Sequence, residues 1–103
     1  MTKKYAASVP YEDYLLESLK NPREAALYLE AAMEDDDPRV FLLALRQVAQ
    51  ARGMSVVAGR AKVGRESLYK ALSKAGNPEI NTVSRVLRAA GLRLSVKPVA
   101  KAA

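Results

Sequence analysis

The sequence predicts an all-α domain that ends in a short β-strand. Two pairs, Asn21-Pro22 and Asp37-Pro38, have the composition of helix starts, and apolar residues follow each at three- and four-residue intervals. Residues 92–97 alternate apolar and polar side chains, which is typical of a half-buried strand. The 103 residues suit one domain rather than two. We therefore expect three parts: an N-terminal arm (1–20), a helical domain ending in the strand (21–97) and a flexible tail (98–103).

The helix boundaries follow from capping residues and breakers. Asn21, Pro22 and Glu24 form a capping-box pattern, so a helix is expected after Pro22. Asp37-Pro38 predicts a second helix over about 38–52, which Gly53 ends. Three shorter helices are expected beyond it: one capped by Ser55 and ending near Ala61, one over about 65–73, and one capped by Asn81 over 82–90.

Both ends of the chain carry weaker patterns. Residues 11–19 can form about two turns of amphipathic helix within a loosely held arm. The strand at 92–97 has no second strand to pair with in the sequence, so we expect it to pair with the same segment of another copy. Leu92, Leu94 and Val96 would then form a dimer contact in an antiparallel ribbon.

The composition excludes many kinds of chemistry. Cysteine and histidine are both absent, which excludes disulfides, Cys/His zinc sites, thiol nucleophiles and imidazole bases. The acidic run over 34–37 lacks the alternation and the glycine of a calcium loop, and a helix end followed by an N-cap explains it. We therefore expect no catalytic residue, no metal site and no cofactor, and an enzyme is the disfavoured class.

The charge is divided unevenly along the chain. Residues 1–40 carry nine acids and five bases, a net of −4, whereas residues 41–103 carry twelve bases and two acids, a net of +10. No apolar run approaches the ~20 residues that span a bilayer, so the basic part favours a nucleic-acid partner over a membrane. The first five residues are not followed by an apolar stretch typical of a secretory signal, and the cytoplasm is the expected compartment.

Two short helices joined by a tight turn lie in the basic part, as in a DNA-binding helix-turn-helix. Ala58 allows close approach of the helices, residues 62–64 form the turn, and Val63 and Leu68 face inward. The outward side chains are of types that contact bases and phosphates in double-stranded DNA. The expected DNA-binding residues are Arg65, Glu66, Ser67, Tyr69, Lys70, Lys62, Ser55, Lys74, Asn77, Asn81 and Thr82. Capping alone also explains Ser55, Asn77, Asn81 and Thr82. For Tyr69 the alternative is that its ring packs over the third helix while its hydroxyl group meets water.

Residues from about 29 to 96 resemble the addiction-module antidote proteins, antitoxins of the host-inhibition-of-growth type with a lambda-repressor-like (Cro-type) helix-turn-helix. The segments that carry the resemblance are YLEAA (28–32), DP (37–38), ARGM (51–54), RESLYKALS (65–73), GNP (76–78) and LRAAGL (87–92). The resemblance implies a five-helix-type lambda-repressor-like domain, repression of the protein's own operon, a homodimer and a RelE-like ribonuclease toxin as partner. Such motifs usually have Gly at the position of Lys62 and Ser at that of Gly64, so Lys62 must adopt a positive φ or the turn must differ.

The acidic N-terminal part is expected to fold onto the basic toxin. Its apolar and aromatic residues are Tyr5, Tyr11, Tyr14, Leu15, Leu16 and Leu19, and the last five are the expected toxin-binding residues. A stand-alone helix-turn-helix transcriptional regulator is the alternative. It would use the same DNA-contacting helix, but it would have no need of an acidic arm.

Overall fold

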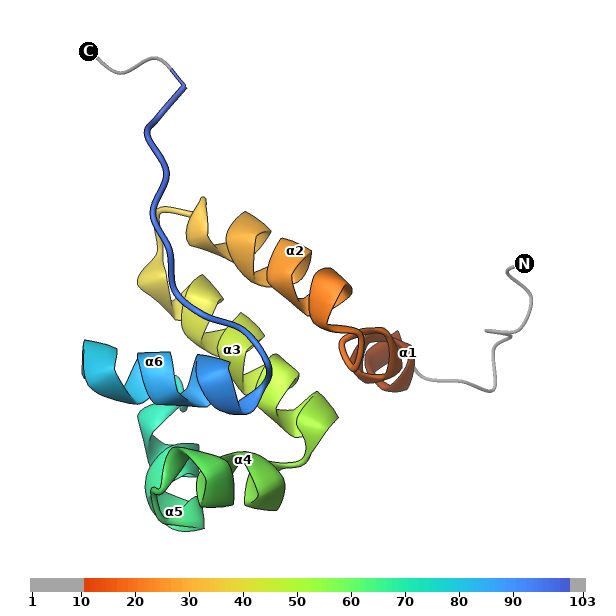
Figure 1. Ribbon diagram of the computed structural model, residues 1–103, viewed down its shortest axis with the longest axis vertical. Helices are drawn as coiled ribbons and strands as arrows, with labels where there is room; N and C mark the ends of the chain where they lie inside the picture. Colours follow the sequence, from red (N-terminus) through yellow and green to blue (C-terminus); the bar gives the residue numbers. More distant parts are fainter. Residues whose placement is uncertain (1–10, 101–103) are drawn as a thin grey trace.

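The computed structural model describes residues 11–100, which form six helices and no strand (Figure 1). Tyr5, which was expected to belong to the toxin-binding arm, lies outside the described residues. The helices are α1 (Tyr11–Ser18), α2 (Pro22–Met33), α3 (Pro38–Arg52), α4 (Met54–Ala61), α5 (Arg65–Ala71) and α6 (Ile80–Ala89).

Asn21 and Asp37 cap the starts of α2 and α3 as predicted. The predicted capping box with Glu24 is not formed, because the Asn21 N–H donates to the Ser18 carbonyl at 3.2 Å. The Asn21 Oδ1 accepts hydrogen bonds from the backbone N–H groups of Arg23 at 2.8 Å and Glu24 at 3.4 Å. The Asp37 Oδ1 accepts the N–H of Arg39 at 2.9 Å. Each cap satisfies backbone donors that have no partner within the helix, and each precedes a proline that needs none. The predicted N-termini of these two helices are confirmed.

The predicted caps of α4 and α6 are wrong. α4 begins at Met54, directly after Gly53, whose φ of 100° turns the chain between α3 and α4 within one residue. Ser55 therefore lies inside the first turn of α4. α6 begins at Ile80 after Glu79, so Asn81 lies inside its first turn. Neither helix has a side-chain cap hydrogen bond.

The core surrounds α3, which contributes Leu45 and Val48 as fully buried side chains. α2 and α4 pack on α3, and α6 packs on α4. α1 packs against α3, and its Leu15 is only 8% exposed. Leu19, immediately after α1, is 2% exposed. Residues 11–19 therefore pack on the core through Leu15 and Leu19, whereas the sequence predicted that they belong to a loosely held arm.

The predicted C-terminal strand is wrong. Residues 92–97 have no strand partner within residues 11–100, and the segment runs past α2 as an irregular extended chain (Figure 1). Leu92 and Leu94 are partly buried against the helical core, whereas Val96 is 96% exposed. Alternating burial arises here from packing on helices, which requires no hydrogen-bonded neighbour. The expected dimer ribbon through Leu92, Leu94 and Val96 requires this strand, so that prediction is wrong as well.

Candidate nucleic-acid interface

α4 and α5 meet through a tight turn whose geometry is set by Lys62. This residue has φ 59° and ψ 45°, in the left-handed region. The N–H of Lys62 donates to the Gly59 carbonyl at 3.3 Å, and the N–H of Val63 donates to the Ala58 carbonyl at 3.1 Å. These two bonds form a Schellman motif, which usually has glycine at this position. Of the two outcomes that the sequence left open, a positive φ at Lys62 or a different turn, the structure has the positive φ.

α5 divides into a buried and an exposed face. Leu68 and Leu72 are both 1% exposed and attach the helix to the core. The five residues expected to point outward are all exposed: Arg65, Glu66, Ser67, Tyr69 and Lys70. The predicted division of this helix into inward and outward residues is confirmed.

The Tyr69 ring lies on the outer face with Arg65. The guanidinium carbon of Arg65 is 5.6 Å from the ring centroid, within the range of a cation–π contact. Two long side chains of α5 are thus grouped at one place on its exposed face. Both remain accessible to a partner.

Two arginines hold α4 against α6. Arg60 Nη1 donates to the Ala89 carbonyl at 3.3 Å, and Arg85 Nη1 donates to the Ala61 carbonyl at 3.0 Å. Each satisfies a carbonyl near a helix C-terminus, where backbone acceptors lack intrahelical partners. Sequence reasoning missed these two residues, because an arginine that binds a distant backbone carbonyl has no pattern in the sequence.

The remaining predicted DNA-binding residues fall in different places. Ser67, Lys70 and Asn77 line one shallow hollow beside α5, whose far wall includes Gly76. A Cβ on Gly76 would lie 2.1 Å from the Ala71 carbonyl oxygen, so only glycine fits there. Lys62 is exposed at the turn. Ser55 and Asn81 are exposed in the first turns of α4 and α6, and Thr82 is partly buried.

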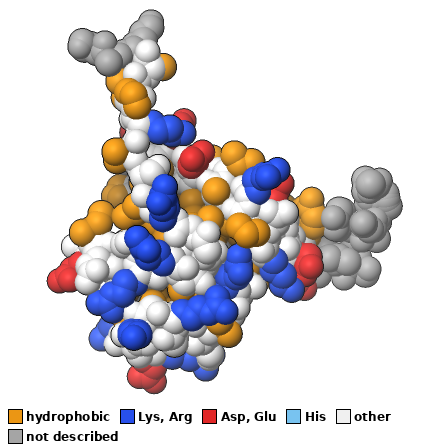
Figure 2. Space-filling model, in the orientation of Figure 1, with side chains coloured by type: hydrophobic (Ala, Val, Ile, Leu, Met, Phe, Trp, Pro, Cys, Tyr) orange, Lys and Arg blue, Asp and Glu red, His pale blue; other side chains and the backbone are white. Residues whose placement is uncertain are grey.

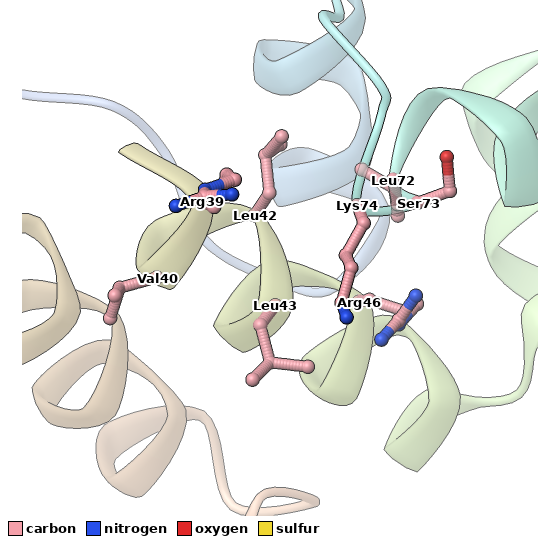
Figure 3. A pocket seen from close by; sticks show the side chains of 8 residues that line it. All are labelled: Arg39, Val40, Leu42, Leu43, Arg46, Leu72, Ser73 and Lys74. Atoms are coloured by element: carbon pink, nitrogen blue, oxygen red, sulfur yellow. The ribbon is translucent and has the colours of Figure 1, made fainter. Parts of the chain in front are cut away.

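Lys74 does not line that hollow. It lines a groove with Leu43 and Arg46 of α3 (Figure 3). Its position is set by the chain after α5, which passes close to α3 at Leu72 and Ser73.

The positive charge of this part of the molecule is largely unpaired. Within residues 11–100 the ion pairs are Lys20–Glu17, Arg39–Asp37 and Lys97–Glu30. None of them includes a base between Arg46 and Arg93. Figure 2 shows Lys and Arg side chains spread over the region of α4, α5 and α6, with few acids among them. An unneutralised surface of this kind attracts a polyanion.

The predicted toxin-binding residues lie on and just after α1. Leu15 and Leu19 are buried in the protein's own core. Tyr11 is 73% exposed, Tyr14 is 37% exposed, and Leu16 is partly exposed. The rings of Tyr11 and Tyr14 meet edge to face with centroids 6.5 Å apart.

The acidic side chains within residues 11–100 do not form a metal site. No group of three or more acids there is arranged to hold a metal ion. The carboxylates of Asp35 and Asp37 instead accept hydrogen bonds from the backbone N–H groups of Asp37 and Arg39. No helix in the described part of the chain is long and apolar enough to cross a membrane.

Comparison with known proteins gives a family. A family model described as "Probable addiction module antidote protein" matches residues 12–98. A protein of Haemophilus influenzae, described as an uncharacterized protein, is 42% identical over 81 residues, which cover 79% of this chain and 84% of that protein. No solved structure matches the chain. The match over nearly the whole chain shows that this protein belongs to the family of probable addiction module antidote proteins.

Proposed function

We propose that the chain is an antitoxin of the host-inhibition-of-growth type that represses its own operon and neutralises a RelE-like ribonuclease toxin. Membership in an antidote family indicates an antitoxin role, a toxin partner and a regulatory rather than an enzymatic protein. The DNA-binding part of the proposal is supported by the exposure of the polar residues of α5, while the buried Leu68 and Leu72 pack this helix against the core.

α4 and α5 act as a lambda-repressor-like (Cro-type) helix-turn-helix in this proposal. α5 enters the major groove, where Arg65 donates two hydrogen bonds to a guanine, and Glu66 and Ser67 contact neighbouring base edges. Lys70, Tyr69 and Lys62 contact phosphates on the groove's rim. Asn77, which shares a hollow with Ser67 and Lys70, adds a further backbone contact.

The protein acts as a homodimer on its operator. Two copies place their α5 helices about 34 Å apart, one turn of DNA, so the expected site is an inverted repeat. Binding two half-sites at once makes the dimer's affinity far higher than that of one domain.

The toxin contact lies on α1. A ribonuclease has a basic surface that holds RNA, and the exposed acids Glu12, Asp13 and Glu17 complement such a surface. Tyr11, which is exposed, and Leu16, which is partly exposed, supply apolar area beside these acids. Leu15 and Leu19 serve by fixing α1 on the core.

Fluorescence anisotropy with the DNA upstream of the gene and with a scrambled duplex tests the DNA-binding part. Arg65→Ala is expected to weaken binding by ~1–3 kcal/mol on the specific duplex and to relax the preference at one base pair. Lys70→Ala is expected to weaken binding to both duplexes alike. It should also reduce the slope of log affinity against log salt concentration by about 1.

Arg23→Ala is the matched control, because Arg23 is an exposed arginine on α2, away from α5 (Figure 1). It should leave both affinities unchanged. The proposal fails if Arg65→Ala and Lys70→Ala behave like Arg23→Ala.

A further inference from the structure

We propose that the protein pairs with a second copy of itself through one face that runs from α2 across α3 to the chain after α5. This inference rests on the homodimer in the proposed function and assigns it a surface. It replaces the overturned strand ribbon with a contact between helices.

The centre of this face is apolar and open. Val40 and Leu43 of α3 line a groove of about 350 Å³ that is closed on one side by Leu72 and Lys74. In Figure 3 Leu43 lies between Val40 on one side and Arg46 and Lys74 on the other. Leu43 is 45% exposed, a large fraction for a leucine in the middle of a helix.

A second hollow continues the same surface toward α2. Val40 and Leu43 also line this hollow, together with Tyr28 and Ala31 of α2. Because the two hollows share these α3 residues, the surface is continuous from α2 to the chain after α5. Contiguous apolar surface of this kind on a soluble protein marks an interaction site.

One end of the face is basic. Arg46 and Lys74 line the groove, and neither belongs to an ion pair within residues 11–100. Arg39, the third base there, is already paired with Asp37 at 2.8 Å. The groove lining contains no acid.

The other end is acidic. Glu24 lies on α2, seven residues before Ala31, and Glu34, the residue directly after α2, lies three residues beyond Ala31. These helical spacings place both acids on the Ala31 side. Both are exposed, and neither belongs to an ion pair in the described part of the chain. Leu27, four residues before Ala31, is also exposed and adds apolar area between the acids.

A face with an apolar centre, one basic end and one acidic end is complementary to itself. A two-fold axis near Leu43 places the basic end of each copy against the acidic end of the other, so the favourable contact forms twice. A basic toxin would complement only the acidic end and would leave Arg46 and Lys74 facing like charge. A second copy is therefore the occupant that fits the whole face.

Sedimentation of the full chain without DNA tests the pairing by charge reversal. Arg46→Glu with Lys74→Glu makes both ends acidic, and Glu24→Lys with Glu34→Lys makes both ends basic. Each double variant alone is expected to have a dimer Kd raised at least tenfold. Mixed in equal amounts, the two variants should form a heterodimer, because acid then faces base at both contacts. Leu43→Glu should also dissociate the dimer, since it places two like charges at the axis.

Two control variants change the charge equally at exposed residues elsewhere: Arg88→Glu with Arg93→Glu, and Glu30→Lys with Glu79→Lys. Both should sediment like the wild type, and thermal unfolding should show that all variants are folded. Folded charge-reversed variants that dimerise like the wild type, or whose mixture stays monomeric, would overturn the pairing. A wild type that is monomeric, and whose Leu43→Glu variant differs from it only in binding added toxin, would also overturn the pairing. A monomeric Leu43→Glu protein that still prefers one operator half-site would leave the DNA-binding proposal intact, which keeps the two tests separate.

Discussion

The guanidinium carbon of Arg65 lies 5.6 Å from the centre of the Tyr69 ring, one helical turn further along α5. An arginine side chain has many rotamers, and ordering it on binding has an entropic cost. The tyrosine ring limits that freedom before any partner is bound. Tyr69 thus orders the Arg65 side chain through its ring, independently of its own hydroxyl group.

We predict that Tyr69→Ala weakens binding to the specific duplex by about 0.5–1 kcal/mol, which is typical of an exposed cation–π contact. The preference at the base pair contacted by Arg65 should relax. Tyr69→Phe keeps the ring and should keep that preference. Anisotropy titrations on the specific and single-substituted duplexes measure both. Equal losses for the two variants would instead identify the hydroxyl as the contacting group.

Lys62→Gly is expected to stabilise the fold by up to about 1 kcal/mol, because glycine adopts a positive φ without steric strain. Chemical unfolding measures the change. Gly91 provides the reverse case, a glycine at the same position of the same motif, with φ 84°. Its N–H donates to the Arg88 carbonyl, and the N–H of Leu92 donates to the Leu87 carbonyl. Gly91→Ala should therefore destabilise the protein. A neutral or destabilising Lys62→Gly would mean that the turn imposes no strain on Lys62.

The pKa of Asp37 provides a test of the α3 start. Hydrogen bonds from the Arg39 side chain, and then from its backbone N–H, hold this pKa below its ordinary value. The charged form is favoured by folding, so its stabilising effect is present at neutral pH and is lost as the pH falls below about 4 through the folded pKa. An NMR titration should show the low pKa in the wild type and a higher one in Arg39→Ala. Asp37→Asn should unfold with a weaker pH dependence over the same acid range, whereas an unchanged dependence would contradict this account.

The proposed toxin contact on α1 predicts that substitutions of its exposed and of its buried residues have different effects. Tyr11→Ser combined with Leu16→Ser should reduce inhibition of the cognate ribonuclease with little change in the unfolding temperature, since both side chains are exposed or partly exposed. Leu15→Ala removes a buried side chain and should destabilise the fold by about 2–5 kcal/mol. A ribonuclease assay paired with thermal unfolding distinguishes the two effects. Full inhibition by the Tyr11/Leu16 variant would place the contact elsewhere.

The amino-acid sequence alone determined the features that depend on neighbours along the chain. The starts of α2 and α3 follow from Asn21 and Asp37, because a side-chain cap bonds to backbone only two or three residues away. The outward residues of α5 follow from the helical spacing of Leu68 and Leu72.

Tertiary structure decided the features that depend on distant parts of the chain. Leu92 and Leu94 alternate with polar residues because they cover helices, and only the packed fold distinguishes this from a strand. From the sequence, Leu15 and Leu19 were expected to be exposed residues of an arm. They are buried because α1 packs against α3. The face around Leu43 combines α2, α3 and the chain after α5, and no local pattern specifies that meeting, because hydrophobic burial is non-directional and selects partners only through the shape of the whole core.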